Sequence, residues 1–406
     1  MRPAETETRR RSTLASGGDW DTSVQWVRLE EGGIIHLFAC ARPESDQGPF
    51  ESQAESMYEN LRMILEEHGA TPADVMTETL FCTDVDRQYA VLESLRRSFY
   101  ELQDSGCGQA PSATFLRQPP CVPGRRCELQ AKVMLHQDGS PVAARRLRIP
   151  GGGAGSGMVV HSNGYDHVYL SNLTGAGDAG GGSGFVSQTR SMFERAEECL
   201  RRQGLTFGNV IRTWFYLRDM EEDYAAFNDI RNRFYRERGV GLLPASTGIQ
   251  GAVFPTDRRC GMDLYALGGR GAYEMRVMHS PTMNDPPAYK SAFSRGIHLG
   301  LNDSSFVYVS GTASINTGGE IVHVGDIEGQ VQRMLHNIEQ LLAGQGVGFD
   351  DVLSAVTYLK EGRFLEAFQR VCARYPELQQ AVNTVVVADV CRPEWLCEME
   401  LMAIGP

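Results

Sequence analysis

Apolar residues recur every three or four positions in three separate stretches of the chain. They are Met57, Leu61, Ile64 and Leu65; Phe193, Ala196 and Leu200; and Val331, Leu335, Ile338 and Leu342. This spacing puts the apolar side chains on one face of a helix. Each stretch is followed by a glycine (Gly69, Gly204, Gly346), a residue typical of the position just past a helix end because it adopts positive φ without strain. The pattern predicts three amphipathic helices, each ending at a glycine.

The residues after these glycines repeat as well. Six positions on, a valine opens an apolar run (Val75, Val210, Val352), and nine positions later an acid closes it (Asp84, Asp219, Glu361). A second helical pattern follows, at 224–236 in the middle copy and 363–374 in the last, and then two short strands. Apolar strand pairs such as DHVYLSNL and SSFVYVSGT precede the first helix of a copy. Each copy therefore reads as a ββαβαββ unit, and the fold class is α+β.

These copies divide the chain into three units. We expect a flexible N-terminus at 1–31, units at 32–137, 165–269 and 288–406, and Gly- and Pro-containing linkers at 138–164 and 270–287. Each unit exposes a sheet face that needs a partner. The sequence therefore predicts that the three units pack together as an internal pseudo-trimer.

Charge and composition narrow the classes of function. A formal net charge of −12 argues against a general nucleic-acid binder. The N-terminus lacks the apolar core of a signal peptide, and no later run reaches the ~18 apolar residues of a membrane helix, so we expect a cytoplasmic monomer or small homo-oligomer without membrane contact. The ten cysteines form no CxxC pair and the nine histidines no metal-ligand spacing, which predicts neither a metal nor a cofactor.

A glycine-rich stretch at 175–180 satisfies the pattern GxGxxG, which is found in dinucleotide-binding folds. In such folds the helix starts inside the motif, whereas here Gly181, Gly182 and Gly184 delay it, and no βαβ context surrounds it. We therefore interpret the stretch as a hairpin loop.

The order of the elements and several motifs resemble a known group of proteins. The units resemble the Rid superfamily (YjgF-like reactive-intermediate deaminases), which form trimers with ligand sites between neighbouring subunits. Over about 160–406, the motifs SGTASI, HVGDIEGQ, LPASTGI and DVCRPEWLCEME are similar to those of chorismatases, which hydrolyse the enolpyruvyl ether of chorismate. The resemblance implies an internal trimer with a site between units, a small carboxylate as substrate, and an extra Rid-like domain at the N-terminus.

Glu398 is the candidate catalytic residue. Strand alternation puts Glu398 and Glu400 on one sheet face and Met399 and Leu401 on the other. If helices cover the Met399 face, the carboxylates look toward a cleft between units, where desolvation raises the pKa of Glu398 and suits it to general acid catalysis. The alternative is a solvated strand face. The resemblance implies that Glu398 takes the position of the chorismatase catalytic glutamate.

The three units differ at this position. Aligning CELQAKV, CGMDLYAL and CEMELMAI places Glu128, Gly261 and Glu398 together, so the three clefts cannot be equivalent. We expect one principal site, at Glu398.

Other candidate substrate-binding residues follow from the same motifs. Small residues at a strand end let a backbone approach a ligand, and here they are Ser310, Gly311, Thr312 and Ala313. The resemblance adds Cys391 and His323, although a lone loop histidine is more often structural. A dianionic substrate needs cations, for which Arg212, Arg295 and Arg392 are the candidates. Asp326 is expected to cap the helix that follows it.

One departure from the family weighs against imine deamination. Rid deaminases carry a Pro-Ala-Arg motif whose arginine holds the substrate carboxylate, and the equivalent positions here are Ala113, Ser246 and Asn383. Three functions therefore stay open at this point: a chorismatase-like hydrolase, a different biosynthetic reaction on the same scaffold, or a ligand-binding protein without catalysis. The last is favoured if Glu128 and Glu398 are both exposed.

Overall fold

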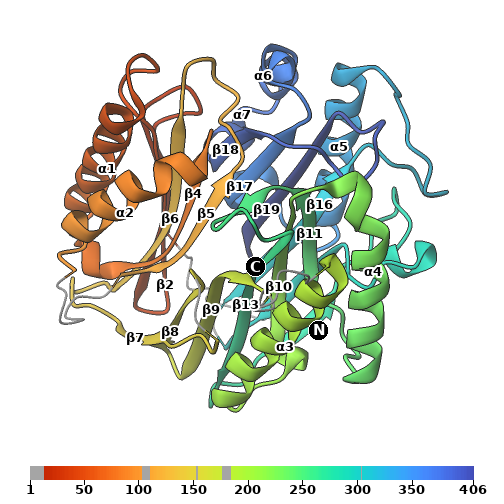
Figure 1. Cartoon of the computed structure of the whole chain (residues 1–406), viewed down its shortest axis with the longest axis horizontal. Helices are drawn as coiled ribbons and strands as arrows, with labels where there is room; N and C mark the ends of the chain where they lie inside the picture. The colour runs from red at the N-terminus through yellow and green to blue at the C-terminus, as the bar shows by residue number, and fades with distance from the viewer. Residues whose placement is uncertain (1–12, 103–109, 152–153, 176–183, 303) are drawn as a thin grey trace, which may run out of the picture.

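Three mixed β-sheets surround a common centre, with the helices on the outside (Figure 1). The computed structural model describes residues 13–102, 110–151, 154–175, 184–302 and 304–406. The glycine-rich stretch at 175–180 lies almost wholly outside these ranges. None of the helices in the described ranges has the combination of length and apolar composition that crossing a membrane requires.

The three units repeat one order of elements. The first contains β1 (Thr13–Gly17), β2 (Val24–Glu31), β3 (Ile34–Ala41), α1 (Phe50–Glu67), η1 (Pro72–Asp74), β4 (Val75–Cys82), α2 (Val85–Phe99), β5 (Ser112–Arg117) and β6 (Cys127–His136). The second contains β7 (Ala143–Leu147), β8 (Ser156–Ser162), β9 (Tyr165–Thr174), α3 (Phe185–Arg202), η2 (Phe207–Asn209), β10 (Val210–Leu217), α4 (Met220–Glu237), β11 (Ala245–Gln250), β12 (Ala252–Val253) and β13 (Cys260–Gly269). The third contains β14 (Glu274–Val277), η3 (Pro286–Tyr289), β15 (Gly296–Gly300), β16 (Ser305–Ala313), α5 (Ile327–Ala343), η4 (Phe349–Asp351), β17 (Val352–Leu359), η5 (Gly362–Phe364), α6 (Leu365–Cys372), α7 (Pro376–Gln379), β18 (Val382–Val387) and β19 (Cys397–Gly405).

The strand order is the same in all three sheets. It runs β2-β3-β6-β4-β5 in the first, β8-β9-β13-β10-β11 in the second and β15-β16-β19-β17-β18 in the third. In each sheet the last pair is parallel and the others are antiparallel. The α+β class and the three-unit pseudo-trimer are thus confirmed.

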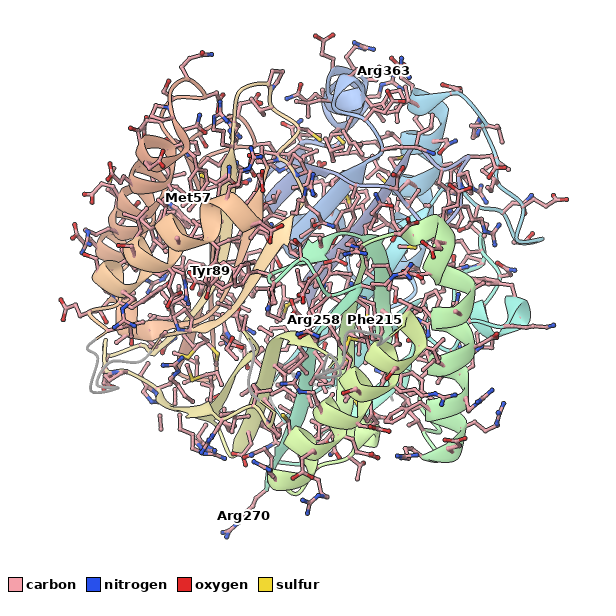
Figure 2. All side chains as sticks on the ribbon, viewed as in Figure 1. Met57, Tyr89, Phe215, Arg258, Arg270 and Arg363 are labelled. Atoms are coloured by element: carbon pink, nitrogen blue, oxygen red, sulfur yellow. The ribbon has the colours of Figure 1, made fainter. Side chains whose placement is uncertain are left out.

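The predicted amphipathic helices cover the outer sheet faces. Their apolar stripes are buried, as Met57 on α1 and Leu335 on α5 show with 0% exposure each. In Figure 2, Met57 and Phe215 lie inside the molecule, whereas Arg270 and Arg363 project from its surface. The inner faces of the sheets turn toward one another and carry the polar residues discussed below.

Segments expected to be flexible or linkers carry strands instead. β1 and β2 lie within 1–31, β7 and β8 within 138–164, and β14 within 270–287. β1, β7 and β14 extend the outer edges of their sheets, where side chains are mostly exposed or partly exposed. An exposed edge strand needs no apolar alternation, which explains why the pattern of the sequence did not reveal these three.

Candidate active site

Glu398 and Glu400 share the inner face of β19, as strand alternation predicted. Met399, on the other face, belongs to the core packed against α5. The two carboxylates then diverge. Glu400 points to the centre of the molecule, where Arg212 Nη2 and Trp214 Nε1 each donate a hydrogen bond of 2.6 Å to it. Glu398 faces a cavity between the second and third units.

This cavity has a volume of about 250 Å³ and is polar and aromatic in character. The second unit contributes residues from α4 and β11, and the third contributes the segment before β15, the end of β16 and the segment leading into β19. The lining residues are Tyr224, Asn228, Arg231, Ser246, Gly248, Tyr289, Ser291, Phe293, Arg295, Gly311, Ala313, Ile315, Cys391, Arg392, Trp395 and Glu398.

The Glu398 carboxyl is only 4% exposed and makes no hydrogen bond to any residue in the described ranges. Burial, with the nearby negative charge of Glu400, raises the pKa of Glu398 to about 8, although Arg295 and Arg212 oppose the shift. At neutral pH the carboxyl therefore carries its proton, and it holds that proton against the cavity.

Gly311 leaves room for this carboxyl where it lies. A Cβ at residue 311 would lie 2.0 Å from Glu398 Oε1, closer than any real contact. The Gly311 amide in turn donates a hydrogen bond of 3.0 Å to Thr247 Oγ1 on β11. The small residue predicted at this strand end thus makes room for the catalytic candidate and joins the two units.

Three guanidinium groups line the cavity without a carboxylate partner in the described part of the chain. Arg231 donates to Asn228 Oδ1 at 2.6 Å, and its Nε is buried without a partner. Arg295 bonds to the Asn284 carbonyl and Arg392 to the Gly319 carbonyl. With Glu398 protonated, the cavity carries an excess of positive charge and spare donors, which suits an anionic ligand.

Aromatic rings hold these guanidinium groups in place. Arg231 lies 5.3 Å from the Phe293 ring centre, and Arg392 lies 4.8 Å from that of Trp395 and 5.5 Å from that of Tyr289. Cation–π contacts orient the planar groups while leaving N–H donors available. The same rings offer a flat apolar surface to the body of a ligand.

The position of the Rid arginine is occupied by Ser246, which lines the cavity. The positive charges come instead from α4 and from the segments before β15 and β19. Burial also raises the pKa of the Cys391 thiol to about 12, so this cysteine stays protonated at neutral pH and is no nucleophile. The described residues contain no group of three His, Cys, Asp or Glu side chains arranged to hold a metal ion.

Four predicted binding residues lie outside the cavity. Ser310 and Thr312 are fully buried, Ser310 bonding across the unit interface to the Ser246 amide and Thr312 to the Ser310 carbonyl. His323 sits on an exposed loop with φ of 60°, and Arg212 pairs with Glu400 at the centre. The sequence placed all four residues near the predicted site, but their side chains point away from the cavity.

Asp326 caps α5, as predicted, accepting a hydrogen bond of 3.0 Å from the Gly329 amide. Its neighbour His323 contributes its carbonyl to Gln330 at the start of the same helix. This loop therefore has a structural role at the helix N-terminus.

The equivalent cleft of the first unit is closed by ion pairs. Arg125 Nη1 lies 2.7 Å from Glu128 Oε1, and Arg42 Nε lies 3.6 Å from Oε2. Trp395 stands where the first unit has Arg125, since CVPGRRCE aligns with CRPEWLCE. Ala313, which pairs with Glu398, stands where the first unit has Arg42, the residue that follows the pair Ala41 and Leu129. Glu398 therefore lacks the two arginines that neutralise Glu128.

The cleft of the second unit is filled by a strand. A Cβ at Gly261 would lie 2.6 Å from the Val253 side chain, which takes the space of the glutamate. Val253 belongs to β12, which crosses over and pairs with β5 of the first unit. Phe254 then stacks on Tyr89 of α2 with ring centres 3.6 Å apart.

Sequence reasoning missed the cavity residues on α4 and also Tyr289, Phe293 and Trp395 of the third unit. Tyr224, Asn228 and Arg231 follow one another at helical spacing on α4, so they share a face, and that face lines the cavity. The polar and aromatic stripe on α4 was the feature of the sequence that could have predicted them.

Comparison with known proteins agrees with this architecture. The family model of Endoribonuclease L-PSP matches residues 166–267 and 283–405, which lie in the second and third units. The 3-aminoacrylate deaminase RutC of Acinetobacter baylyi is 27% identical over 99 residues, 24% of this chain and 79% of the relative. A RutC family protein of Pyrococcus abyssi is 30% identical over 112 residues, covering 27% of this chain and 84% of the relative.

A chorismatase crystal structure shares the fold over most of the molecule. The TM-score is 0.60 with 16% identity, over 90% of this chain and 98% of the chorismatase. The likeness thus extends beyond 160–406, to which the motifs had limited it, and includes much of the first unit. Because the family model covers more than half of the sequence, this protein belongs to the Endoribonuclease L-PSP family.

Proposed function

We propose that this protein is a hydrolase that acts on the enolpyruvyl ether of a small dianionic carboxylate, with chorismate as the leading candidate, and releases pyruvate. One observation carries the proposal: a carboxyl kept protonated by its surroundings faces a cavity ringed by three guanidinium groups that lack carboxylate partners. The shared fold with a chorismatase supports it.

The chemistry needs an acid first and a base afterwards. Glu398 transfers its proton to the methylene carbon of the enolpyruvyl group, and the ether-bearing carbon becomes an oxocarbenium ion. Water adds to that carbon and returns a proton to the Glu398 carboxylate. The resulting hemiketal collapses to pyruvate and an alcohol, so that the ring is released as a cyclohexadiene or, after loss of water, as a hydroxybenzoate. Proton transfer from a positioned acid contributes roughly 10²–10⁴-fold to such a rate.

The guanidinium groups have a separate task. Arg231, Arg295 and Arg392 would hold the two substrate carboxylates and so place the methylene carbon against Glu398. Since neither Glu398 nor Glu128 is exposed, the condition that favours a ligand-binding protein without catalysis is not met.

A coupled assay tests the proposal. Purified protein is incubated with chorismate, and pyruvate is followed by NADH consumption with lactate dehydrogenase. We expect turnover by the unmodified chain, little by Glu398→Gln, and unchanged chorismate binding in that variant because the amide keeps the shape but has no acidic proton. Folded protein that binds chorismate yet releases no pyruvate above background would point to a different reaction in the same cavity.

A further inference from the structure

A second cavity lies at the centre of the molecule, lined by the inner faces of all three sheets. Its volume is about 180 Å³, which is space for roughly six water molecules. It shares no lining residue with the cavity at Glu398. The site is thus separate from the proposed active site.

The cations of this central cavity have donors to spare. Arg212 Nη2 is bonded to Glu400 and Thr247, but Arg212 Nη1 is buried without any hydrogen-bond partner among the described residues. Lys132 on β6 is partly buried and, among the described residues, makes one hydrogen bond, of 3.0 Å, to the Tyr169 hydroxyl, although an ammonium group has three donors. A buried donor left unpaired, such as Arg212 Nη1, is costly, which favours a ligand that accepts hydrogen bonds.

The acids of the cavity are already satisfied. Glu400 accepts from Arg212 and Trp214, and Asp263 accepts from the Asn172 amide and from the hydroxyls of Thr114 and Tyr216. Burial raises the pKa of Asp263 to about 6, so it is mostly ionised at neutral pH. Two cations then face two carboxylates, and among anionic ligands one with a single negative charge disturbs this balance least.

The walls of the cavity define the rest of the ligand. Lys132 Nζ lies 5.6 Å from the ring centre of Phe38, 5.4 Å from that of Tyr169 and 5.9 Å from that of Tyr265. Tyr169 and Tyr265 are themselves stacked, with ring centres 5.0 Å apart, and Tyr308 lies against Tyr265. Such walls receive a flat apolar body.

We propose that the central cavity is a second binding site, for a small monocarboxylate with a flat apolar body, whose carboxylate is received by Lys132 Nζ and Arg212 Nη1. The proposal is independent of the reaction at Glu398. It accounts for the unpaired donor on a buried arginine and for the singly bonded lysine within one cavity.

Tryptophan emission can report on the two cavities separately. Trp214 lines the central cavity and Trp395 lines the cavity at Glu398, whereas Trp20 and Trp26 line neither. Benzoate is the probe, benzamide its neutral isostere and inorganic phosphate the second anion. In Trp395→Phe, we expect benzoate to change the emission saturably, benzamide to leave it unchanged, and phosphate to bind at least tenfold more weakly. The response should vanish when Trp214→Phe is added.

Variants of Lys132 connect the signal to the proposed contact. We expect Lys132→Gln to weaken benzoate binding about tenfold or more, Lys132→Arg to retain it, and the exposed Lys290→Gln to change nothing. Thermal unfolding will show whether Lys132→Gln folds. If it does not, the comparison of benzoate with benzamide binding to the protein with Lys132 intact tests the proposal. The proposal would be overturned if benzoate did not change the emission of Trp214, or if benzamide or phosphate bound as tightly as benzoate. It would also be overturned if a folded Lys132→Gln bound benzoate as tightly as the protein with Lys132 intact does.

Discussion

Replacing Trp395 by arginine should give Glu398 an ion pair like the one that Glu128 makes with Arg125. In the first unit the same position holds Arg125, whose Nη1 lies 2.7 Å from Glu128. Two opposite charges about 4 Å apart in a partly desolvated site attract by about 4 kcal/mol, which equals about three pKa units. We therefore expect Trp395→Arg to lower the pKa of Glu398 from about 8 to about 5.

The consequence for catalysis follows from the protonated fraction. At pH 7 a carboxyl of pKa about 8 is about 90% protonated, and one of pKa about 5 is about 1% protonated. The rate of pyruvate release at pH 7 should fall about ninety-fold. The alkaline limb of the pH–rate profile should move to lower pH by about three units.

Trp395→Gln is the matched control. It removes the ring, its contact with Arg392 and its hydrogen bond to the Ser314 carbonyl, as the arginine variant does, but adds no charge. Full pH profiles of both variants are compared in the coupled assay. If both lose activity at the same pH as the unmodified chain, the protonation of Glu398 does not control the rate and the reasoning fails.

Three further predictions concern stability and binding. Burial raises the folded-state pKa of Glu398, so unfolding releases a proton between about pH 4.5 and 8, and the free energy of unfolding falls as the pH rises through this window. Glu398→Gln has no such proton to lose, so between pH 5 and 9 its free energy of unfolding in urea should rise by up to about 5 kcal/mol relative to that of the unmodified chain. Glu128→Gln leaves Arg42 without a carboxylate partner and Arg125 with Asp46 alone, so we expect a loss of up to about 3–5 kcal/mol in the same measurement. Turnover per folded molecule should stay largely unchanged, and a full loss of turnover would contradict the choice of site. Arg231→Met should raise KM for chorismate at least tenfold, and an unchanged KM would show that Arg231 does not bind the substrate. The melting temperature should not fall, because burying a guanidinium without a carboxylate partner is itself unfavourable.

The repeated helices and strands were predictable because their signals are local. The apolar stripe that contains Met57, the glycine after it and the valine that opens the next strand act within one turn or one strand, and each was found where expected. The inward face of Glu398 followed equally from the two-residue period of a strand. Edge strands such as β7 escaped because exposure removes the apolar pattern.

The remainder of the site depends on contacts between distant parts of the chain. The approach of Arg231 on α4 to Glu398 on β19 is set by how two units dock, and no short-range pattern encodes that. The same holds for Val253, which fills the glutamate position of its own unit only because β12 pairs with β5 of another. Arg212 shows the same dependence, since the sequence places its strand near the site but its side chain pairs with Glu400.

Joining the three units in one polypeptide has a consequence for how such a molecule can vary. In an assembly of identical subunits every substitution is made three times, so a change that closes one cleft closes all of them. Here Arg125 and Arg42 close one cleft, Val253 fills another next to Gly261, and Trp395 leaves the third open; each of these residues occurs once in the molecule. Two of the interfaces can therefore contribute stability alone. The third can bury an acid that has no ion-pair partner, because the stability of the other two offsets the loss.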